Sequence, residues 1–165
     1  MKYCRTTTLN HPVSVAHPNC IEDINTLIVR EGCSRAVPLF TNSEIVINLD
    51  FAEELIANAS GRLLNKSMDM GFGIKNSSST KINMLMVELK FDVKDFYHLR
   101  RKDLEEKVAG SSLILGNIPP IYKLYIFIVK SDKIQEAINR LFRMVPKIDS
   151  NYVAMDIYQL KDRFF

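Results

Sequence analysis

Three charged residues stand in apolar runs of the kind that form buried strands. Asp69 lies in residues 68–74, and Glu88 and Lys90 lie near the end of residues 82–91. Burying a carboxylate or an ammonium is costly unless the group is paired with an opposite charge or binds a ligand. We therefore expect the three side chains to lie together and to serve a chemical purpose.

The three residue types suit metal-assisted chemistry on a phosphodiester. Asp69 and Glu88, on adjacent strands, can share Mg²⁺ or Mn²⁺, which prefer oxygen ligands, and the backbone carbonyl of Leu89 is a further ligand. A bound ion acidifies a water and neutralises charge on the phosphate. Lys90 projects from the same strand face as Glu88, because side chains repeat every two residues, and can orient the water or stabilise the phosphorus centre.

The two runs predict a hairpin of strands 68–74 and 82–91, joined by a polar turn at residues 75–80. In the first strand, alternation puts Asp69 on one face with Gly71 and Gly73. The other face then carries Met68, Met70, Phe72 and Ile74.

An acidic residue, a gap, and a hydrophobic run ending in Glu-x-Lys form the motif of the PD-(D/E)xK nuclease superfamily. The stretch "MDMGFGI…INMLMVELKF" resembles the core hairpin of that superfamily, although Met68 stands where the motif has proline. The resemblance implies that Asp69 is the first acid, Glu88 the second and Lys90 the lysine. It also implies a restriction-endonuclease-like core and a Mg²⁺- or Mn²⁺-dependent endonuclease that acts on DNA.

The order of elements in the superfamily core is helix, three strands, helix, strand. We expect it to correspond to a helix at 50–64, the hairpin, a helix near 101–108 and a strand at 121–130. The core would then span about residues 50–130 of a single domain, with an N-terminal arm and a C-terminal helix and strand as additions. Some members carry an acid on the first helix, for which Glu54 or Glu53 is the candidate.

A second register would use residues 34–40 and 44–49 as the first two strands, with Asp50 as the acid. A whole helix would then interrupt the hairpin, so we favour the register of Asp69. In the helix at 50–65, Asp50 can act as N-cap with Glu53 as its capping-box partner. The expected buried stripe of this helix is Phe51, Leu55, Ala59 and Leu63.

The rest of the chain alternates between helices and strands, which predicts an α/β fold with a mixed central sheet flanked by helices. Residues 1–19 read as a surface arm or an edge strand. A helix begins near residue 21, and another covers 101–110, capped by Asp103 with Glu106 and stopped near Gly110. The strongest helical pattern covers residues 132–145, and a last strand at 152–160 precedes a charged tail.

The composition of the chain excludes few functional classes. The chain has 165 residues, 47% of them hydrophobic, and a net charge of +3, which permits a nucleic-acid partner without requiring one. The start of the sequence has no apolar signal region and no stretch suits a membrane span, so we expect a cytoplasmic protein. The spacing of the three cysteines and three histidines matches no zinc site.

Arg100, Arg101 and Lys102 are candidates for binding a phosphate backbone, with DNA a more probable partner than RNA. Cutting both strands would require a homodimer or a partner subunit. A plainer interpretation makes this run the solvated end of a helix. It also leaves Glu88 and Lys90 exposed on an edge strand, and Asp69 held in a turn by backbone N–H groups. These residues would then belong to a non-catalytic nucleic-acid-binding or protein-interaction module.

Overall fold

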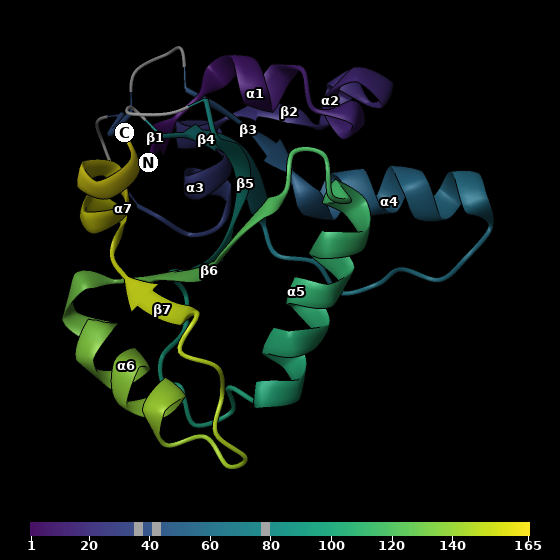
Figure 1. Cartoon of the computed structure of the whole chain (residues 1–165). Helices are drawn as coiled ribbons and strands as arrows, with labels where there is room; N and C mark the ends of the chain where they lie inside the picture. Colours follow the sequence, from purple (N-terminus) through teal and green to yellow (C-terminus); the bar gives the residue numbers. More distant parts are fainter. Residues whose placement is uncertain (35–37, 41–43, 77–79) are drawn as a thin grey trace.

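The computed structural model describes residues 1–34, 38–40, 44–76 and 80–165. This part of the chain forms an α/β fold in which a mixed seven-stranded sheet is flanked by helices (Figure 1). The sequence-based prediction of a mixed central sheet between helices is therefore confirmed.

The strands follow the chain across the sheet in the order β2-β3-β4-β5-β6-β7, and β1 pairs with the other end of β4. Their neighbours are antiparallel up to β5, whereas β5, β6 and β7 are parallel. The strands are β1 (Lys2–Tyr3), β2 (Ile21–Asp23), β3 (Ile45–Asn48), β4 (Met70–Lys75), β5 (Ile82–Lys90), β6 (Ile121–Val129) and β7 (Tyr152–Met155).

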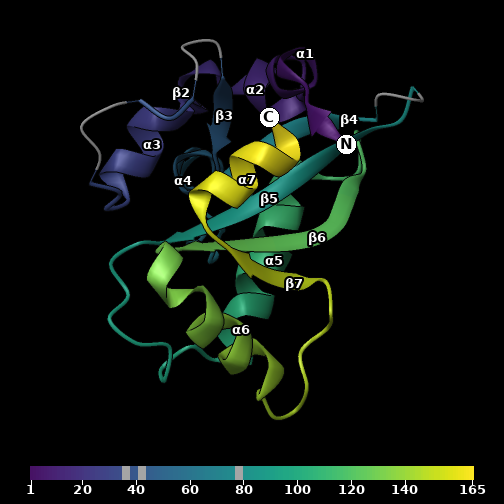
Figure 2. The ribbon, with the colours of Figure 1, turned by 90° about the vertical axis from the view of Figure 1, so that its left-hand side faces the viewer.

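Parallel neighbours need crossover connections, and helices supply them after β5 and after β6. The α-helices are α1 (Arg5–Leu9), α2 (Pro12–Ala16), α3 (Ile24–Arg30), α4 (Leu49–Ser60), α5 (Arg101–Leu115), α6 (Ile134–Phe142) and α7 (Ile157–Phe164). Short 3₁₀ turns cover Pro18–Cys20 and Ser131–Lys133. Buried residues of α5 and α6 pack on one face of the sheet and those of α3 and α7 on the other. In Figure 2, α7 lies in front of β5 and α5 lies behind it.

The hairpin of β4 and β5 has the predicted position, and Met70 pairs with Val87. Met70, Phe72 and Ile74 pack together with α3 and α7, as alternation predicted. The prediction was wrong for Met68, which packs on the opposite side with the residues of α5. Met68 precedes β4, so the alternation of the strand does not extend to it.

The N-terminal residues fold onto the sheet, so the expected surface arm was wrong, whereas a strand is present only at Lys2–Tyr3. After the short strand β1, the Gly73 N–H donates to Thr8 Oγ1 at 2.9 Å. His11 Nε2 lies 3.1 Å from the Leu115 carbonyl oxygen of α5. The helices α1 and α2 have five residues each, too few for a recognisable periodic pattern.

Helix α4 begins one residue earlier and ends sooner than predicted. Its N-cap is Asn48, whose side chain accepts from the Phe51 N–H at 3.0 Å, so the prediction of Asp50 as cap was wrong. Gly61 ends the helix in the left-handed region at φ 62°, which leaves Leu63 92% exposed. The predicted stripe was also wrong, since the buried residues are Leu49, Ala52, Glu53 and Ala57.

Helix α5 continues through Gly110 to Leu115 instead of stopping at the glycine. The predicted capping box is absent, because Arg100 occupies the N-cap, while Asp103 and Glu106 both pair with Lys66. Gly110 is needed for close packing: a Cβ there would lie 2.0 Å from the Lys66 carbonyl oxygen.

The strand predicted at 44–49 is confirmed as β3, but it precedes α4, so α4 is followed by two strands and not by three. The described part of 34–40 contains no strand, and its residues 35–37 lie outside the described residues. Residues 41–43, between the two strands of the second register, also lie outside them, as does the centre of the turn predicted at 75–80. The strand predicted at 152–160 ends at Met155, and α7 follows.

In the described ranges, no helix combines the length and the apolar character that crossing a membrane requires.

Candidate functional site

Asp69 and Glu88 lie opposite each other on the sheet face that α4 and α5 cover. Continuing the register from Met70↔Val87 by one residue pairs Asp69 with Glu88. Both are buried, with exposed fractions of 6% and 0%. The interpretation that Glu88 is exposed on an edge strand was therefore wrong, and β5 lies inside the sheet between β4 and β6.

Two backbone N–H groups donate hydrogen bonds to Asp69, one to its carbonyl oxygen and one to its side chain. The Leu49 N–H donates to the Asp69 carbonyl oxygen at 3.1 Å, which ties the residue to the start of α4. On the other side, the Leu89 N–H donates to Asp69 Oδ2 in a short hydrogen bond. In a strand the N–H and C=O of one residue point to the same edge, so the Leu89 carbonyl also faces the Asp69 side.

Two lysines compensate the charge of Glu88. Lys90 Nζ forms a short ion pair with Glu88 Oε1, and Lys107 Nζ lies 2.8 Å from the same oxygen and 2.9 Å from Oε2. Oε1 has no hydrogen bond of good geometry although both ammonium groups are within ion-pair distance. A buried carboxylate held by two ammonium groups avoids most of the cost of burial.

Lys107 is the site residue that the sequence analysis missed. It lies on α5, and its ammonium also donates to the Ser67 carbonyl oxygen at 2.8 Å. The available signal was its position: Lys107 falls between Leu104, Val108 and Ser111, which are buried along the same stripe of α5. A charge on the inner stripe of a helix needs a partner in the core, here Glu88.

The electrostatic environment raises the pKa values of both Asp69 and Lys90, for different reasons. Burial, together with the negative charge of Glu88, raises the pKa of Asp69 to about 7. The Leu89 N–H and the charges of Lys107 and Lys90 offset only part of this increase. For Lys90, burial lowers the pKa, but Glu88 and Asp69 outweigh it, and the net pKa is raised. Asp69 is thus the group whose charge changes near neutral pH.

A cavity of about 460 Å³ opens beside Asp69. Its wall also includes Asp50, Glu54 and Glu22, together with Arg30. Asp50 accepts a short hydrogen bond from Ser67 Oγ, and its charge contributes to raising the pKa of Lys90. With Glu31, five carboxylates and one guanidinium therefore line a polar opening that reaches Asp69, whereas Glu88 does not line it.

The structure distinguishes between the two acids proposed for helix α4. Glu54 is exposed and lines the same cavity as Asp69. Glu53 is buried and accepts from Arg62 Nη2 at 2.9 Å and from the Asn65 N–H at 2.6 Å. The hydrogen bond from Arg62 lowers the pKa of Glu53. Glu53 thus fixes the segment that follows α4.

The basic residues proposed for phosphate binding lie at the N-terminal end of α5. Arg101 pairs with Glu105 at 2.7 Å, and Lys102 lies 3.6 Å from Glu106. Arg100 is exposed at the N-cap. Two of the three cations therefore have carboxylate partners on their own helix, as the interpretation of a solvated helix end predicted.

The possible metal ligands at the buried pair are all oxygen atoms, which Mg²⁺ and Mn²⁺ prefer. Asp69 and Glu88 supply two carboxylates, and the Leu89 carbonyl faces the same place. Within the described residues, no group of three or more His, Cys, Asp or Glu side chains could hold a metal ion. Two carboxylates would leave most ligand positions of a divalent ion to water, and such an ion would bind here only if Glu88 gave up contacts with its lysines.

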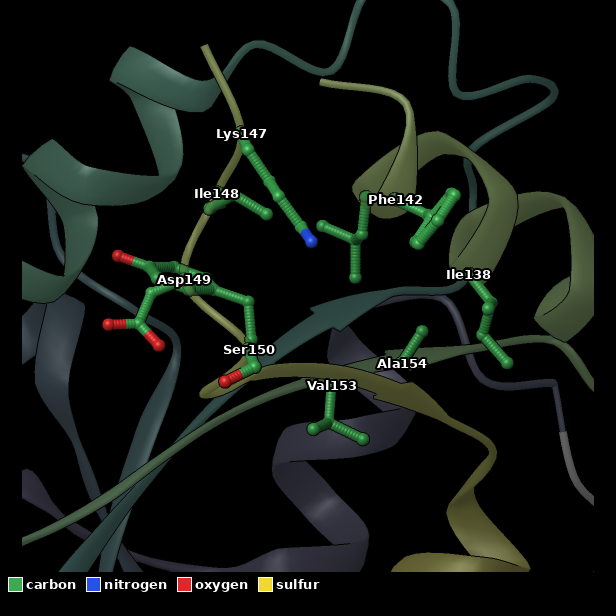
Figure 3. A pocket seen from close by; sticks show the side chains of 10 residues that line it. Ile138, Phe142, Lys147, Ile148, Asp149, Ser150, Val153 and Ala154 are labelled. Carbon is green, nitrogen blue, oxygen red and sulfur yellow. The ribbon is translucent and has the colours of Figure 1, made fainter. Parts of the chain in front are cut away.

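A second cavity, of about 420 Å³, lies between α6 and β7 (Figure 3). Its wall is mainly apolar, with Ile138, Phe142 and Val153, and Lys147 extends across it to a point 5.6 Å from the centre of the Phe142 ring. Asp69 and Glu88 do not line this cavity, so it is separate from the candidate site.

No family model matches the chain, and no curated protein or solved structure matches it either.

Proposed function

We propose that the protein is a metal-dependent, nuclease-like phosphodiesterase that acts on DNA. The observation that carries this proposal is the buried pair of Asp69, directly before β4, and Glu88 on β5, with Lys90 two residues after Glu88 on the same strand face. Lys90 and Lys107 compensate Glu88, whereas Asp69 is buried with a raised pKa beside a polar cavity, as is common at functional sites.

The order of elements supports a restriction-endonuclease-like core. Helix α3, strands β3, β4 and β5, helix α5 and strand β6 follow one another as helix, three strands, helix and strand. Helix α4 is then an insertion between the first and second strands, while Asp69 still precedes the second strand. This register starts the core at α3, earlier than the helix at 50–64 that the sequence suggested.

The roles follow from the positions of the side chains. Asp69 and Glu88 would hold Mg²⁺ or Mn²⁺, with the Leu89 carbonyl as a further ligand. The bound ion supplies Lewis acidity toward a water molecule and the phosphate. Lys90 places an ammonium beside the carboxylates, where it can orient the attacking water and stabilise negative charge on the phosphate. Glu54 lines the same cavity as Asp69, where it would hold a water near the ion.

The remaining predictions belong to the same proposal. Arg100, Arg101 and Lys102 would contact the phosphate backbone of DNA, and a homodimer or partner subunit would supply the second site for cutting both strands. We keep the cytoplasm as the predicted location.

A plasmid-nicking assay tests the proposal. With Mg²⁺ or Mn²⁺ the wild-type chain should convert supercoiled plasmid to the open circle, and EDTA should stop the reaction. Lys90→Ala and Asp69→Asn should lower the rate at least about 100-fold, because each removes a group that acts on the reacting phosphate. The matched control is Lys123→Ala, an exposed lysine on β6, which should retain the wild-type rate.

The proposal fails if Lys90→Ala nicks plasmid as fast as wild type, or if neither protein nicks it with either metal. Circular dichroism spectra of the variants should match wild type, so that loss of fold is separated from loss of chemistry.

A non-catalytic nucleic-acid-binding module is the second candidate. The observation that favours it is the charge balance at Glu88, where Lys90 and Lys107 already neutralise the carboxylate without any ion. Such a module should shift DNA in a gel at low salt, lose binding as salt rises, and show no dependence on Mg²⁺.

A further inference from the structure

Lys107 occupies a position typical of a cation among protein oxygens. Its Nζ lies 2.8 Å from Glu88 Oε1, 2.9 Å from Glu88 Oε2 and 2.8 Å from the Ser67 carbonyl oxygen. The ammonium therefore contacts both oxygens of the carboxylate that a metal would need. Its side chain is only 22% exposed, so these contacts are made largely out of water.

Lys107 also acts on the other carboxylate. Its positive charge lowers the pKa of Asp69, and this effect is larger than that of Lys90. The ammonium thus contacts the Glu88 carboxylate and favours the charged form of Asp69. Lys90, by comparison, forms its ion pair with one oxygen of Glu88.

An ammonium and a divalent ion cannot share these oxygens at contact distance. A metal between Asp69 and Glu88 needs at least one oxygen of Glu88, and its charge would repel an ammonium a few ångströms away. The stem of Lys107 is flexible, with four carbons, and can carry the ammonium toward solvent. Lys90 would remain beside Glu88 from the strand itself.

We propose that Lys107 is a built-in counterion that competes with the divalent ion for Glu88. This inference rests on the proposed function, because it concerns the same carboxylates. In the metal-free protein Lys107 neutralises the buried carboxylate and keeps it in place. Metal binding displaces the ammonium from Glu88, so the site binds its ion more weakly than the bare carboxylates would.

The test measures Mn²⁺ binding by isothermal titration calorimetry at pH 8 on the full chain. Lys107→Met keeps the length and apolar stem of the side chain but removes the charge, and Lys90 still pairs with Glu88. We expect its Kd for Mn²⁺ to fall about tenfold below the wild-type value, since a single nearby charge has effects of this size. Lys107→Arg keeps the charge and should not bind Mn²⁺ more tightly than wild type. Lys94→Met, at an exposed position outside the site, should match wild type.

Thermal melting gives a second readout. Without metal, Lys107→Met should melt below wild type, and Mn²⁺ should raise its Tm by more than it raises the wild-type Tm. If Lys107→Met fails to fold, Lys107→Gln, which retains a hydrogen-bond donor, takes its place.

The outcomes separate the two proposals. An equal or weaker Mn²⁺ affinity in Lys107→Met overturns the competition and leaves the metal-dependent function standing. Absence of Mn²⁺ binding in wild type and in every variant overturns both proposals.

Discussion

At the scale of single residues, the site contains two negative and two positive side chains that are largely buried. Glu88 contacts both lysines, whereas the lysine charges only partly offset the burial of Asp69. Asp69 therefore keeps a pKa near 7 while lining the cavity. A carboxyl group that loses its proton near neutral pH makes the stability of the folded protein depend on pH.

Asp69 should make the folded protein less stable as the pH rises from about 4 to 7. Its pKa of about 7 in the folded protein exceeds the value of about 3.9 of an unfolded chain, so the folded protein binds more protons in this window. Asp69→Asn removes this dependence and keeps an oxygen that can accept from the Leu89 N–H. Relative to wild type, the variant should gain roughly 2–4 kcal/mol between pH 4.5 and 7.5, measured by urea unfolding.

Asp103→Asn is the control for this pH dependence. A hydrogen bond from Lys66 lowers the pKa of Asp103, so the stability it contributes is present above pH 4 and is lost as the pH falls further. Its difference from wild type should stay constant between pH 4.5 and 7.5. A constant difference for Asp69→Asn as well would contradict the raised pKa.

At the scale of elements, helix α5 positions the site by holding the segment that leads into β4. The Met68 N–H donates to Ser111 Oγ at 2.7 Å, and Lys107 donates to the Ser67 carbonyl. Gly110 lies between Lys107 and Ser111 on α5 and lets the backbone of Lys66 approach the helix. The position of Asp69 thus depends on a glycine that general helix propensity would disfavour.

Gly110→Ala should destabilise the protein by roughly 1–3 kcal/mol, as overpacking does. In an ordinary helix interior the same change stabilises by about 1 kcal/mol, so the sign of the effect tests the close packing. Lys102→Ala, on an 85% exposed side chain of α5, should change stability by less than about 0.5 kcal/mol. Urea unfolding measures both variants, and a stabilised Gly110→Ala would show that the helix and the segment are farther apart.

At the scale of the whole molecule, the two ends of the chain pack against each other. The N and C termini lie close together (Figure 1). Tyr3 stacks on Phe165 with ring centres 4.8 Å apart, and the Lys2 ammonium donates to the Asp162 carbonyl oxygen at 3.0 Å. Helices α1 and α2 follow β1 over β4 and reach α5. The N-terminal residues are therefore part of the folded body.

Thr8→Val tests this conclusion with an almost isosteric change. It removes the oxygen that accepts from the buried Gly73 N–H, and leaving that N–H without a partner should cost about 1–3 kcal/mol. Thr6→Val makes the same chemical change at an exposed position of α1 and should be nearly neutral. Equal stabilities of the two variants in thermal melts would mean that the N-terminal segment does not hold the sheet.

The sequence by itself determined the elements whose patterns are local. The alternation in β4 and β5 defined a hairpin, its two-residue period put Glu88 and Lys90 on one face, and the succession of elements predicted a mixed sheet between helices. Strand pairing then brings Asp69 opposite Glu88, because the hairpin fixes the register over a short loop.

Tertiary structure alone decided what surrounds these residues. Lys107 is 19 positions from Glu88, and no local pattern predicts that α5 turns this lysine toward β5. The pairing of Asp103 and Glu106 with Lys66, in place of a capping box on α5, likewise depends on a partner far along the chain. A charge in a hydrophobic run is visible in the sequence. Which opposite charge pairs with it depends on tertiary packing, because packing brings together segments that are far apart along the chain.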